Sequence, residues 1–252
     1  MLKKKLLVVA LASAFSLPAL ADDLTVSSNV SLVSDYLYRG ISQSGALPAL
    51  QGGFDLSHSS GLYAGVWGSS ISWVSDAGLA NSAGLELDTY AGYKGTAADI
   101  GYDIGFLRYN YPGSYVAAAI KPDTNEIYGA LSYSIVTAKL SYSLGDLFGV
   151  SKAQGSTYAE LNASYAIADT GITVGGHAGL QTYTGATADA AKAGGADPSY
   201  SDYKLSVTKD FSGYVAGLAF SGTNASSFYT TITPEAKKLG KGTVVLSLSR
   251  AM

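Results

Sequence analysis

Residues 24–39 read LTVSSNVSLVSDYLYR, and this stretch alternates apolar with polar side chains. Leu24, Val26, Val30 and Leu32 fall on even positions, whereas the odd positions are mostly hydroxyl, amide or charged residues. Successive side chains of a β-strand point to opposite faces. The period of two therefore predicts a strand over 24–39 that has one apolar and one polar face.

An export signal precedes this strand. Three lysines at positions 3–5 are followed by an apolar run from Leu6 to Leu17 and by Ala19-Leu20-Ala21, the small-x-small pattern that signal peptidase cleaves. The apolar run is shorter than the roughly 20 residues that a membrane-spanning helix needs. We expect residues 1–21 to be a cleavable signal peptide and residues 22–252 to form one domain.

The alternating pattern recurs twelve times along the chain. It predicts strands at 24–39, 49–57, 62–73, 84–93, 98–109, 125–133, 136–144, 156–166, 171–183, 201–209, 213–221 and 242–251. The connections alternate between short (58–61, 94–97, 134–135, 167–170, 210–212) and long (40–48, 74–83, 110–124, 145–155, 184–200, 222–241). This is typical of outer-membrane barrels. The sequence therefore predicts an all-β fold, an antiparallel transmembrane β-barrel of about 12 strands with short periplasmic turns and long extracellular loops.

The composition favours this class and disfavours others. The chain has 19 Tyr, 30 Gly and no Cys, so disulfides and thiolate metal sites are excluded. Tyrosine suits a membrane interface because it combines an apolar ring with a hydroxyl. We expect an inner aromatic girdle of Tyr93, Tyr133, Tyr165 and Tyr214 and an outer one of Tyr36, Tyr38, Tyr142, Tyr203 and Phe220.

The polar faces of the predicted strands carry most of the charge. The predicted lumen-lining residues are Asp35, Arg39, Asp55, Glu86, Asp88, Lys94, Asp99, Asp103, Glu126, Lys139, Glu160, His177, Asp202 and Lys204, and Tyr63 and Trp67 also point inward. A hairpin turn near Gly95 would bring Asp103 opposite Glu86 and Asp88. These acids form either a cation-favouring constriction or structural ion pairs with Arg39, Lys139 and Lys204 that plug the barrel.

Catalysis, cofactors and metal ions find little support in the sequence. His58 lies in a predicted turn beside Ser59 and Ser60, which favour turns. His177 is predicted to face the lumen, but its glycine neighbours supply no orienting acid, so only an acid from another strand could orient it. We therefore expect no enzyme activity, no catalytic residues, no cofactor and no metal site.

The last strand indicates how such a barrel is assembled. Barrel-assembly machinery recognises a C-terminal strand with apolar residues at alternate positions. The chain matches this pattern at Val244, Leu246, Leu248 and Met252, but departs from it at Arg250 and in its non-aromatic last residue. The other expected partners are outer-membrane lipids and small solutes or ions. No basic patch suggests nucleic acid. We expect a monomer in the outer membrane of a Gram-negative bacterium.

Several segments resemble the TorF-type family of porin-like proteobacterial outer-membrane proteins. The resemblance is carried by residues 34–44 (SDYLYRGISQS), 48–55 (PALQGGFD), 61–69 (GLYAGVWGS), 86–88 (ELD), 92–93 (GY), 109–113 (YNYPG) and 126–128 (EIY). It implies a small outer-membrane barrel and brings no substrate or catalytic residue. The expected function is a channel for passive passage of small solutes or ions that favours cations. The alternative is a non-conducting barrel with a structural or surface-interaction role.

Overall fold

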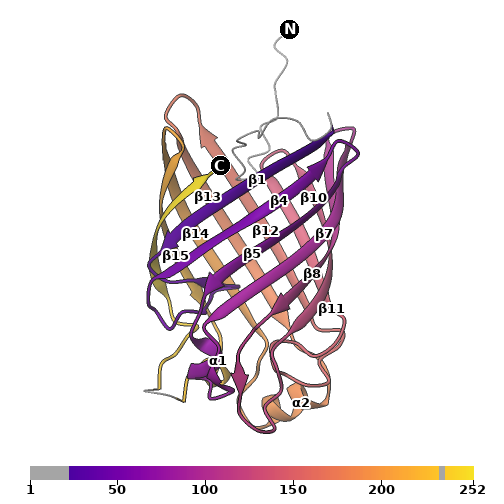
Figure 1. Ribbon diagram of the computed structural model, residues 1–252. Coiled ribbons are helices and arrows are strands. Elements are labelled where there is room, and N and C mark those ends of the chain that lie inside the picture. The colour runs from indigo at the N-terminus through magenta and orange to yellow at the C-terminus, as the bar shows by residue number, and fades with distance from the viewer. Residues whose placement is uncertain (1–22, 233–235) are drawn as a thin grey trace.

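The computed structural model describes residues 23–232 and 236–252, within which twelve antiparallel strands close into a barrel (Figure 1). The strands of the barrel are β1 (Leu24–Val33), β4 (Ala49–His58), β5 (Leu62–Ser70), β7 (Leu85–Ala97), β8 (Ile100–Asn110), β10 (Thr124–Tyr133), β11 (Val136–Ser143), β12 (Thr157–Ile167), β13 (Ile172–Thr182), β14 (Tyr200–Phe211), β15 (Tyr214–Thr223) and β16 (Thr243–Ala251). The predicted fold class and strand number are confirmed. The predicted signal peptide lies outside the described residues.

Neighbours in sequence are neighbours in the barrel, and β1 closes it by pairing with β16. In that seam Val30 lies opposite Arg250, and Leu32 lies opposite Leu248. Closure removes free strand edges, so the backbone groups of the strands pair within the barrel.

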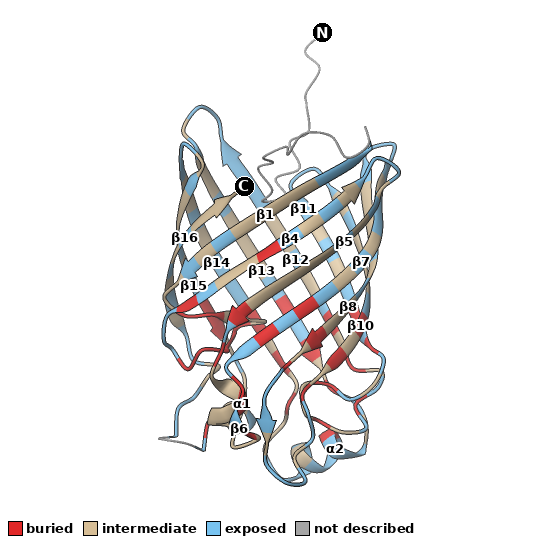
Figure 2. Cartoon of the chain, viewed as in Figure 1, coloured by how far each residue is buried: buried red, intermediate tan, exposed pale blue. Residues whose placement is uncertain are grey.

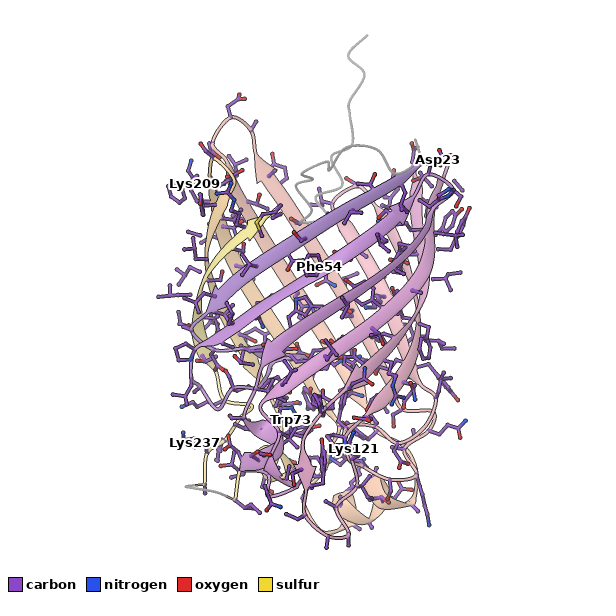
Figure 3. The ribbon with its side chains drawn as sticks, viewed as in Figure 1. Asp23, Phe54, Trp73, Lys121, Lys209 and Lys237 are labelled. Carbon is purple, nitrogen blue, oxygen red and sulfur yellow. The ribbon has the colours of Figure 1, made fainter. Side chains whose placement is uncertain are left out.

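Large apolar side chains point away from the barrel axis. Phe54, Leu131 and Leu205 are among them, each with 60% or more of its surface exposed, and Figure 3 shows Phe54 midway along the wall. On the same strands Asp55, Ser132 and Ser206 occupy the neighbouring inward positions. The alternation read from the sequence therefore separates an apolar exterior from a polar interior.

The two ends of the barrel differ. Both ends of the described chain lie at the end with short turns, here called the turn end, whereas all long connections meet at the other end, the loop end (Figure 1). The loop end also holds the small elements β2 (Leu37–Tyr38), β3 (Ile41–Ser42), β6 (Ala80–Ser82), β9 (Ser114–Tyr115), α1 (Trp73–Asp76), α2 (Ala186–Ala193) and η1 (Ser227–Tyr229). The predicted alternation of connection lengths is confirmed. No helix in the described part of the chain is long and apolar enough to cross a membrane.

The tightly packed core sits at the loop end rather than halfway along the barrel (Figure 2). One cluster joins Tyr36, Val74, Tyr109 and Tyr111, and a second lies around Leu147 among the loops. Side chains are therefore packed more densely at the loop end than in the rest of the barrel interior.

Inward tyrosines pack on inward glycines of adjacent strands. The ring of Tyr90 covers Gly65 and the ring of Tyr63 covers Gly92, so closely that a Cβ on either glycine would collide with the ring. Rings that shield glycine in this way stabilise strands that glycine alone would weaken. This packing accounts for part of the high content of both residue types.

Three predicted boundaries are wrong. The strand predicted over 62–73 ends at Ser70, and Trp73 begins α1. The strand predicted over 24–39 ends at Val33 because the chain turns inward. The hairpin between β7 and β8 turns at Ala98 and Asp99, with Ala98 at φ 53°, rather than near Gly95. As a result Asp103 pairs with Lys94, and Asp88 pairs with Tyr109, so the predicted approach of Asp103 to Glu86 and Asp88 does not occur.

Leu205→Arg tests the assignment of the two faces, because Leu205 is 64% exposed on the barrel exterior in the middle of β14. In lipid vesicles it should lower the free energy of unfolding by about 2–4 kcal/mol, the cost of an Arg at the bilayer midplane. Ser206→Arg, which points into the lumen one residue along, should cost much less. Equal losses in urea titrations of the two variants would contradict the assignment.

Candidate functional site

Residues 34–48, here called the inserted loop, leave β1 and fold into the loop end of the barrel. A short hairpin of β2 and β3 lies within it. Arg39 and Gly40 reverse the chain with φ values of 48° and 76°, in the left-handed region. A Cβ on Gly40 would lie 2.5 Å from Thr223 Cγ2 and 2.7 Å from Asp202 Cβ, so only glycine fits this position.

Asp35 holds the two ends of the hairpin together. Its Oδ1 accepts hydrogen bonds from the hydroxyls of Ser42 at 2.6 Å and Ser44 at 3.1 Å, and Ser44 Oγ accepts one from the backbone of Tyr36. Burial raises the pKa of the Asp35 carboxyl, while these serine hydrogen bonds act in the opposite direction. The network fixes the shape of the inserted loop from within.

Arg39 ties the inserted loop to two strands of the barrel. Its guanidinium donates to Glu126 Oε2 on β10 and to Gln181 Oε1 on β13, each at 2.7 Å. The side chains of Arg39 and Glu126 are only 6% and 3% exposed. The guanidinium also lies 4.3 Å from the ring centroid of Tyr158 and 4.9 Å from that of Tyr38. A charge this deeply buried is stable only when it is paired, so these contacts set where the loop sits.

Two tyrosines of the inserted loop make further contacts with the wall. Tyr36 donates to Glu86 Oε1 at 3.0 Å, and its ring packs edge-on against Trp67. The hydroxyl of Tyr38 bonds that of Tyr109, which in turn donates to Glu126 Oε2 at 3.2 Å. The loop is therefore anchored to β5, β7, β8, β10 and β13.

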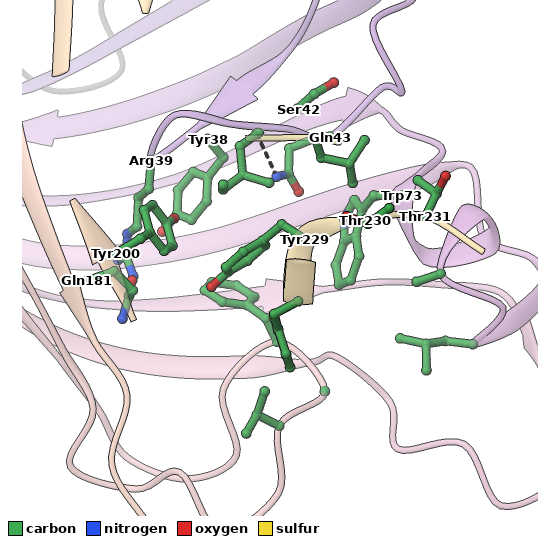
Figure 4. A pocket seen from close by; sticks show the side chains of 18 of the residues that line it. Tyr38, Arg39, Ser42, Gln43, Trp73, Gln181, Tyr200, Tyr229, Thr230 and Thr231 are labelled. Carbon is green, nitrogen blue, oxygen red and sulfur yellow. Dashed lines mark hydrogen bonds between the residues drawn. The ribbon is translucent and has the colours of Figure 1, made fainter. Parts of the chain in front are cut away.

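The inserted loop separates two cavities. A cavity of about 250 Å³, here called the outer pocket, lies among the loops (Figure 4). A second cavity of about 410 Å³, here called the inner chamber, lies inside the barrel on the other side of the loop. Tyr38 and Arg39 line both cavities. The side chains of these two residues thus form the partition between the loop region and the lumen.

A polar network lines the inner chamber. His177 Nε2 lies 2.9 Å from Asp202 Oδ1 and 3.0 Å from the hydroxyl of Tyr158, and His177 Nδ1 lies 2.7 Å from Asn162 Oδ1. Asn162 donates to Glu160, which lies 3.9 Å from Lys139 Nζ. The tertiary structure thus supplies His177 with the acid that its sequence neighbours lack.

The structure distributes the predicted lumen-lining residues over three regions of the barrel. Glu86, Asp88, Glu126 and Asp202 are buried near the inserted loop, and Lys139, Glu160, His177 and Lys204 line the inner chamber. Nearer the turn end, Asp55 accepts from Tyr90 and Asp103 from Tyr63, and Lys94 lies over the ring of Tyr63.

Four predicted positions need correction. Tyr36 and Tyr38 are not in an outer girdle, because the inserted loop carries them into the core. Asp35 bonds Ser42 and Ser44 and lines a separate hollow with residues 236–239 and Lys241, rather than the lumen. Asp99 is exposed in the β7–β8 turn. The remaining predicted girdle residues are exposed on the exterior: Tyr93, Tyr133, Tyr142, Tyr165, Tyr203, Tyr214 and Phe220.

Sequence reasoning placed Glu126 in the lumen but missed three other residues that contact Arg39: Gln181, Tyr158 and Phe148. Gln181 and Tyr158 occupy inward positions of predicted strands, so the alternation could have identified them. Phe148, whose ring centroid lies 5.9 Å from the Arg39 guanidinium, belongs to a loop, where no alternation marks it. Within 23–232 and 236–252, no group of three or more His, Asp or Glu side chains could hold a metal ion.

A sequence profile described as "Bacterial protein of unknown function (Gcw_chp)" matches residues 19–252. The chain belongs to this family. A search of curated proteins finds no match to this Gcw_chp chain. The family description does not name the TorF-type family, so that resemblance stays a prediction.

Solved porin structures are similar to this Gcw_chp protein at low sequence identity. A KdgM porin in complex with disordered oligogalacturonate has 6% identity and a TM-score of 0.49, over 89% of this chain and 97% of that one. OccAB4 of Acinetobacter baumannii has 10% identity and a TM-score of 0.45, over 92% of this chain and 63% of that one. OprD of Pseudomonas aeruginosa has 13% identity and a TM-score of 0.39, over 92% and 67%. The chain thus spans about two thirds of the length of the last two.

Arg39→Ala should lower the free energy of unfolding by about 3–5 kcal/mol, because it leaves Glu126 buried without its counter-charge. Arg108→Ala is the matched control, since its pair with Asp123 has side chains 40% and 20% exposed and should be worth at most about 1 kcal/mol. Denaturant titrations in micelles would measure both. Similar losses for the two variants would show that the Arg39 pair does not anchor the inserted loop.

Proposed function

We propose that this protein is an outer-membrane channel for small solutes whose external end is narrowed by the inserted loop. The observation that carries the proposal is the inner chamber of about 410 Å³, a hollow lined by charged and polar side chains that ends at Tyr38 and Arg39. A barrel that served only as a scaffold has no need for a hollow polar lumen. Barrels of about this strand number lie between filled small barrels and open porins.

The outer-membrane location is supported by the barrel surface. Its exterior is a continuous set of exposed Leu, Ile, Val and Phe side chains with tyrosines towards both ends, the arrangement that a bilayer and its interfaces favour. Both ends of the barrel-forming chain, at β1 and β16, lie at the turn end. We therefore assign the turn end to the periplasm and the loop end to the cell exterior, as in other outer-membrane barrels.

The constriction consists of three anchors that cross the lumen: Arg39 to Glu126, Tyr38 to Tyr109 and Tyr36 to Glu86. All three start from one loop of 15 residues. A displacement of that loop would join the inner chamber to the outer pocket without any change in the barrel wall. Conduction would then depend on the position of the inserted loop.

The lumen is proposed to favour cations. Inside the barrel, the carboxylates at Asp55, Asp103, Glu126, Glu160 and Asp202 outnumber the basic groups at Arg39, Lys94, Lys139 and Lys204, even when the adjacent buried acids Glu86 and Asp88 are left out of the count. An excess of acids makes the potential of a narrow lumen negative and raises the local concentration of cations. The selectivity is spread along the lumen, because Asp103 does not join Glu86 and Asp88.

A non-conducting barrel with a structural or surface-interaction role is the second candidate. It is favoured by the packed core at the loop end and by the buried Arg39–Glu126 pair. The two candidates differ in what happens when the anchors are removed. A channel opens wider, whereas a scaffold only loses stability.

Single-channel recordings in planar bilayers test the channel. The Arg39→Ala/Glu126→Ala protein, which removes the pair without leaving an unpaired charge, should conduct more than the unmodified protein. Arg108→Ala should conduct like the unmodified protein. If neither the unmodified protein nor the double variant conducts while both stay folded, the non-conducting alternative is correct.

Reversal potentials in a salt gradient test the selectivity. The unmodified protein should favour cations, and Asp103→Asn/Glu160→Gln should shift the reversal potential towards zero because two lumenal charges are lost. Asp99→Asn/Asp169→Asn removes two exposed turn charges instead and should leave the potential nearly unchanged. Anion preference, or equal shifts in both variants, would rule out the proposed role of the lumenal acids.

A further inference from the structure

The outer pocket is walled by aromatic rings from several loops. Seven rings line it: Tyr38, Trp73, Phe148, Tyr183, Tyr200, Phe228 and Tyr229. Several are held edge-on against one another, with ring centroids 5.0 Å apart for Tyr200 and Tyr229 and 5.1 Å apart for Phe228 and Tyr229. Such contacts hold the rings in place, so the walls are already arranged before any ligand enters.

Several polar side chains of the wall form hydrogen bonds within the protein, whereas the buried Trp73 Nε1 has no hydrogen-bond partner among the described residues. Tyr229 donates to the carbonyl of Pro198 at 2.5 Å, and the Gln43 amide donates to the carbonyl of Ile41. Gln181 donates to the carbonyl of Thr157 and accepts from Arg39. A ligand with many hydroxyl groups would lose its hydrogen bonds to water and find few partners here, which is costly.

The charge of the outer pocket is compensated. Arg39 is the one charged side chain among the described residues that line it, and Glu126 pairs with it from the lumen side at 2.7 Å. An anion therefore meets a cation that is already neutralised, and a cation meets no carboxylate. A charged ligand of either sign would therefore find no unpaired counter-charge in the lining of the pocket.

We propose that the outer pocket binds a neutral, mainly apolar aromatic molecule of one or two rings. Its volume of about 250 Å³ is below the roughly 300–1,000 Å³ of sites for drug-sized ligands, which limits the ligand to a small ring system. Ring faces and edges on several sides offer stacked and edge-on contacts to such a molecule. This proposal does not depend on whether the barrel conducts. Tyr38 and Arg39 belong both to the wall of the outer pocket and to the constriction.

The experiment uses the full chain in lipid nanodiscs and 4-fluoroanisole as the probe, followed by ¹⁹F NMR. Empty nanodiscs give the non-saturable partition of the probe into lipid. Ala77→Trp fills the pocket from its wall, and Phe228→Ala removes one ring. Ala193→Trp on α2 is the matched control, because Ala193 is exposed and does not line the pocket.

The unmodified protein and Ala193→Trp should bind the probe saturably with the same Kd. Ala77→Trp should abolish saturable binding, and Phe228→Ala should weaken it by about fivefold, the worth of one aromatic contact. Thermal unfolding checks that each variant is folded. If Ala77→Trp does not fold, Phe228→Ala decides the result.

Three results would overturn the proposal. The first is the absence of saturable binding to the unmodified protein. The second is unchanged binding in the folded pocket variants. The third is displacement of the probe by methyl α-glucoside, tetramethylammonium or benzoate at concentrations similar to that of the probe, which would assign the pocket to a sugar, a cation or an anion instead.

Discussion

The buried ion pair of Arg39 and Glu126 is the interaction on which the interior of this protein depends. A guanidinium in the core of a barrel is tolerated only with a carboxylate and further hydrogen bonds around it. Glu126, Gln181 and the rings of Tyr38 and Tyr158 meet that requirement together. Because Arg39 sits beside Gly40 in a left-handed reversal, satisfying its charge also fixes the path of residues 34–48. A buried pair of this kind adds little net stability but specifies one arrangement.

From that constraint follows the division of the lumen into two parts. At the loop end, the inserted loop packs against the aromatic clusters around Tyr109 and Leu147 and leaves the outer pocket between the loops. Towards the turn end, the lumen is hollow and lined by charged groups in a hydrogen-bonded network around His177 and Asp202. The barrel wall is the same in both parts, so the difference comes from what the loops place inside it. A channel would use the hollow part of the lumen, whereas a scaffold would depend on the packed part.

Tyr38 and Arg39 connect the two cavities physically. A ligand in the outer pocket would contact the same side chains that close the inner chamber, so binding and opening would share one set of contacts. In thermodynamic terms, a ligand shifts the position of the inserted loop only to the degree that it binds one position better than another. The aromatic walls of the pocket and its few free polar groups indicate which chemistry could supply that difference.

The sequence alone determined the barrel. Alternation with a period of two and the regular change between short and long connections specify twelve strands and their faces, because a shift by one residue would turn every apolar side chain inward. The sequence pattern did not predict the inserted loop, because the alternation continues through Tyr38 although the strand ends at Val33. Only the tertiary structure decided where Arg39 goes, because its partners lie 87 and 142 residues away in sequence. Likewise, a turn at Ala98 and Asp99 rather than near Gly95 moved Asp103 from the acids of β7 to Lys94, because local turn geometry sets the register of the whole hairpin.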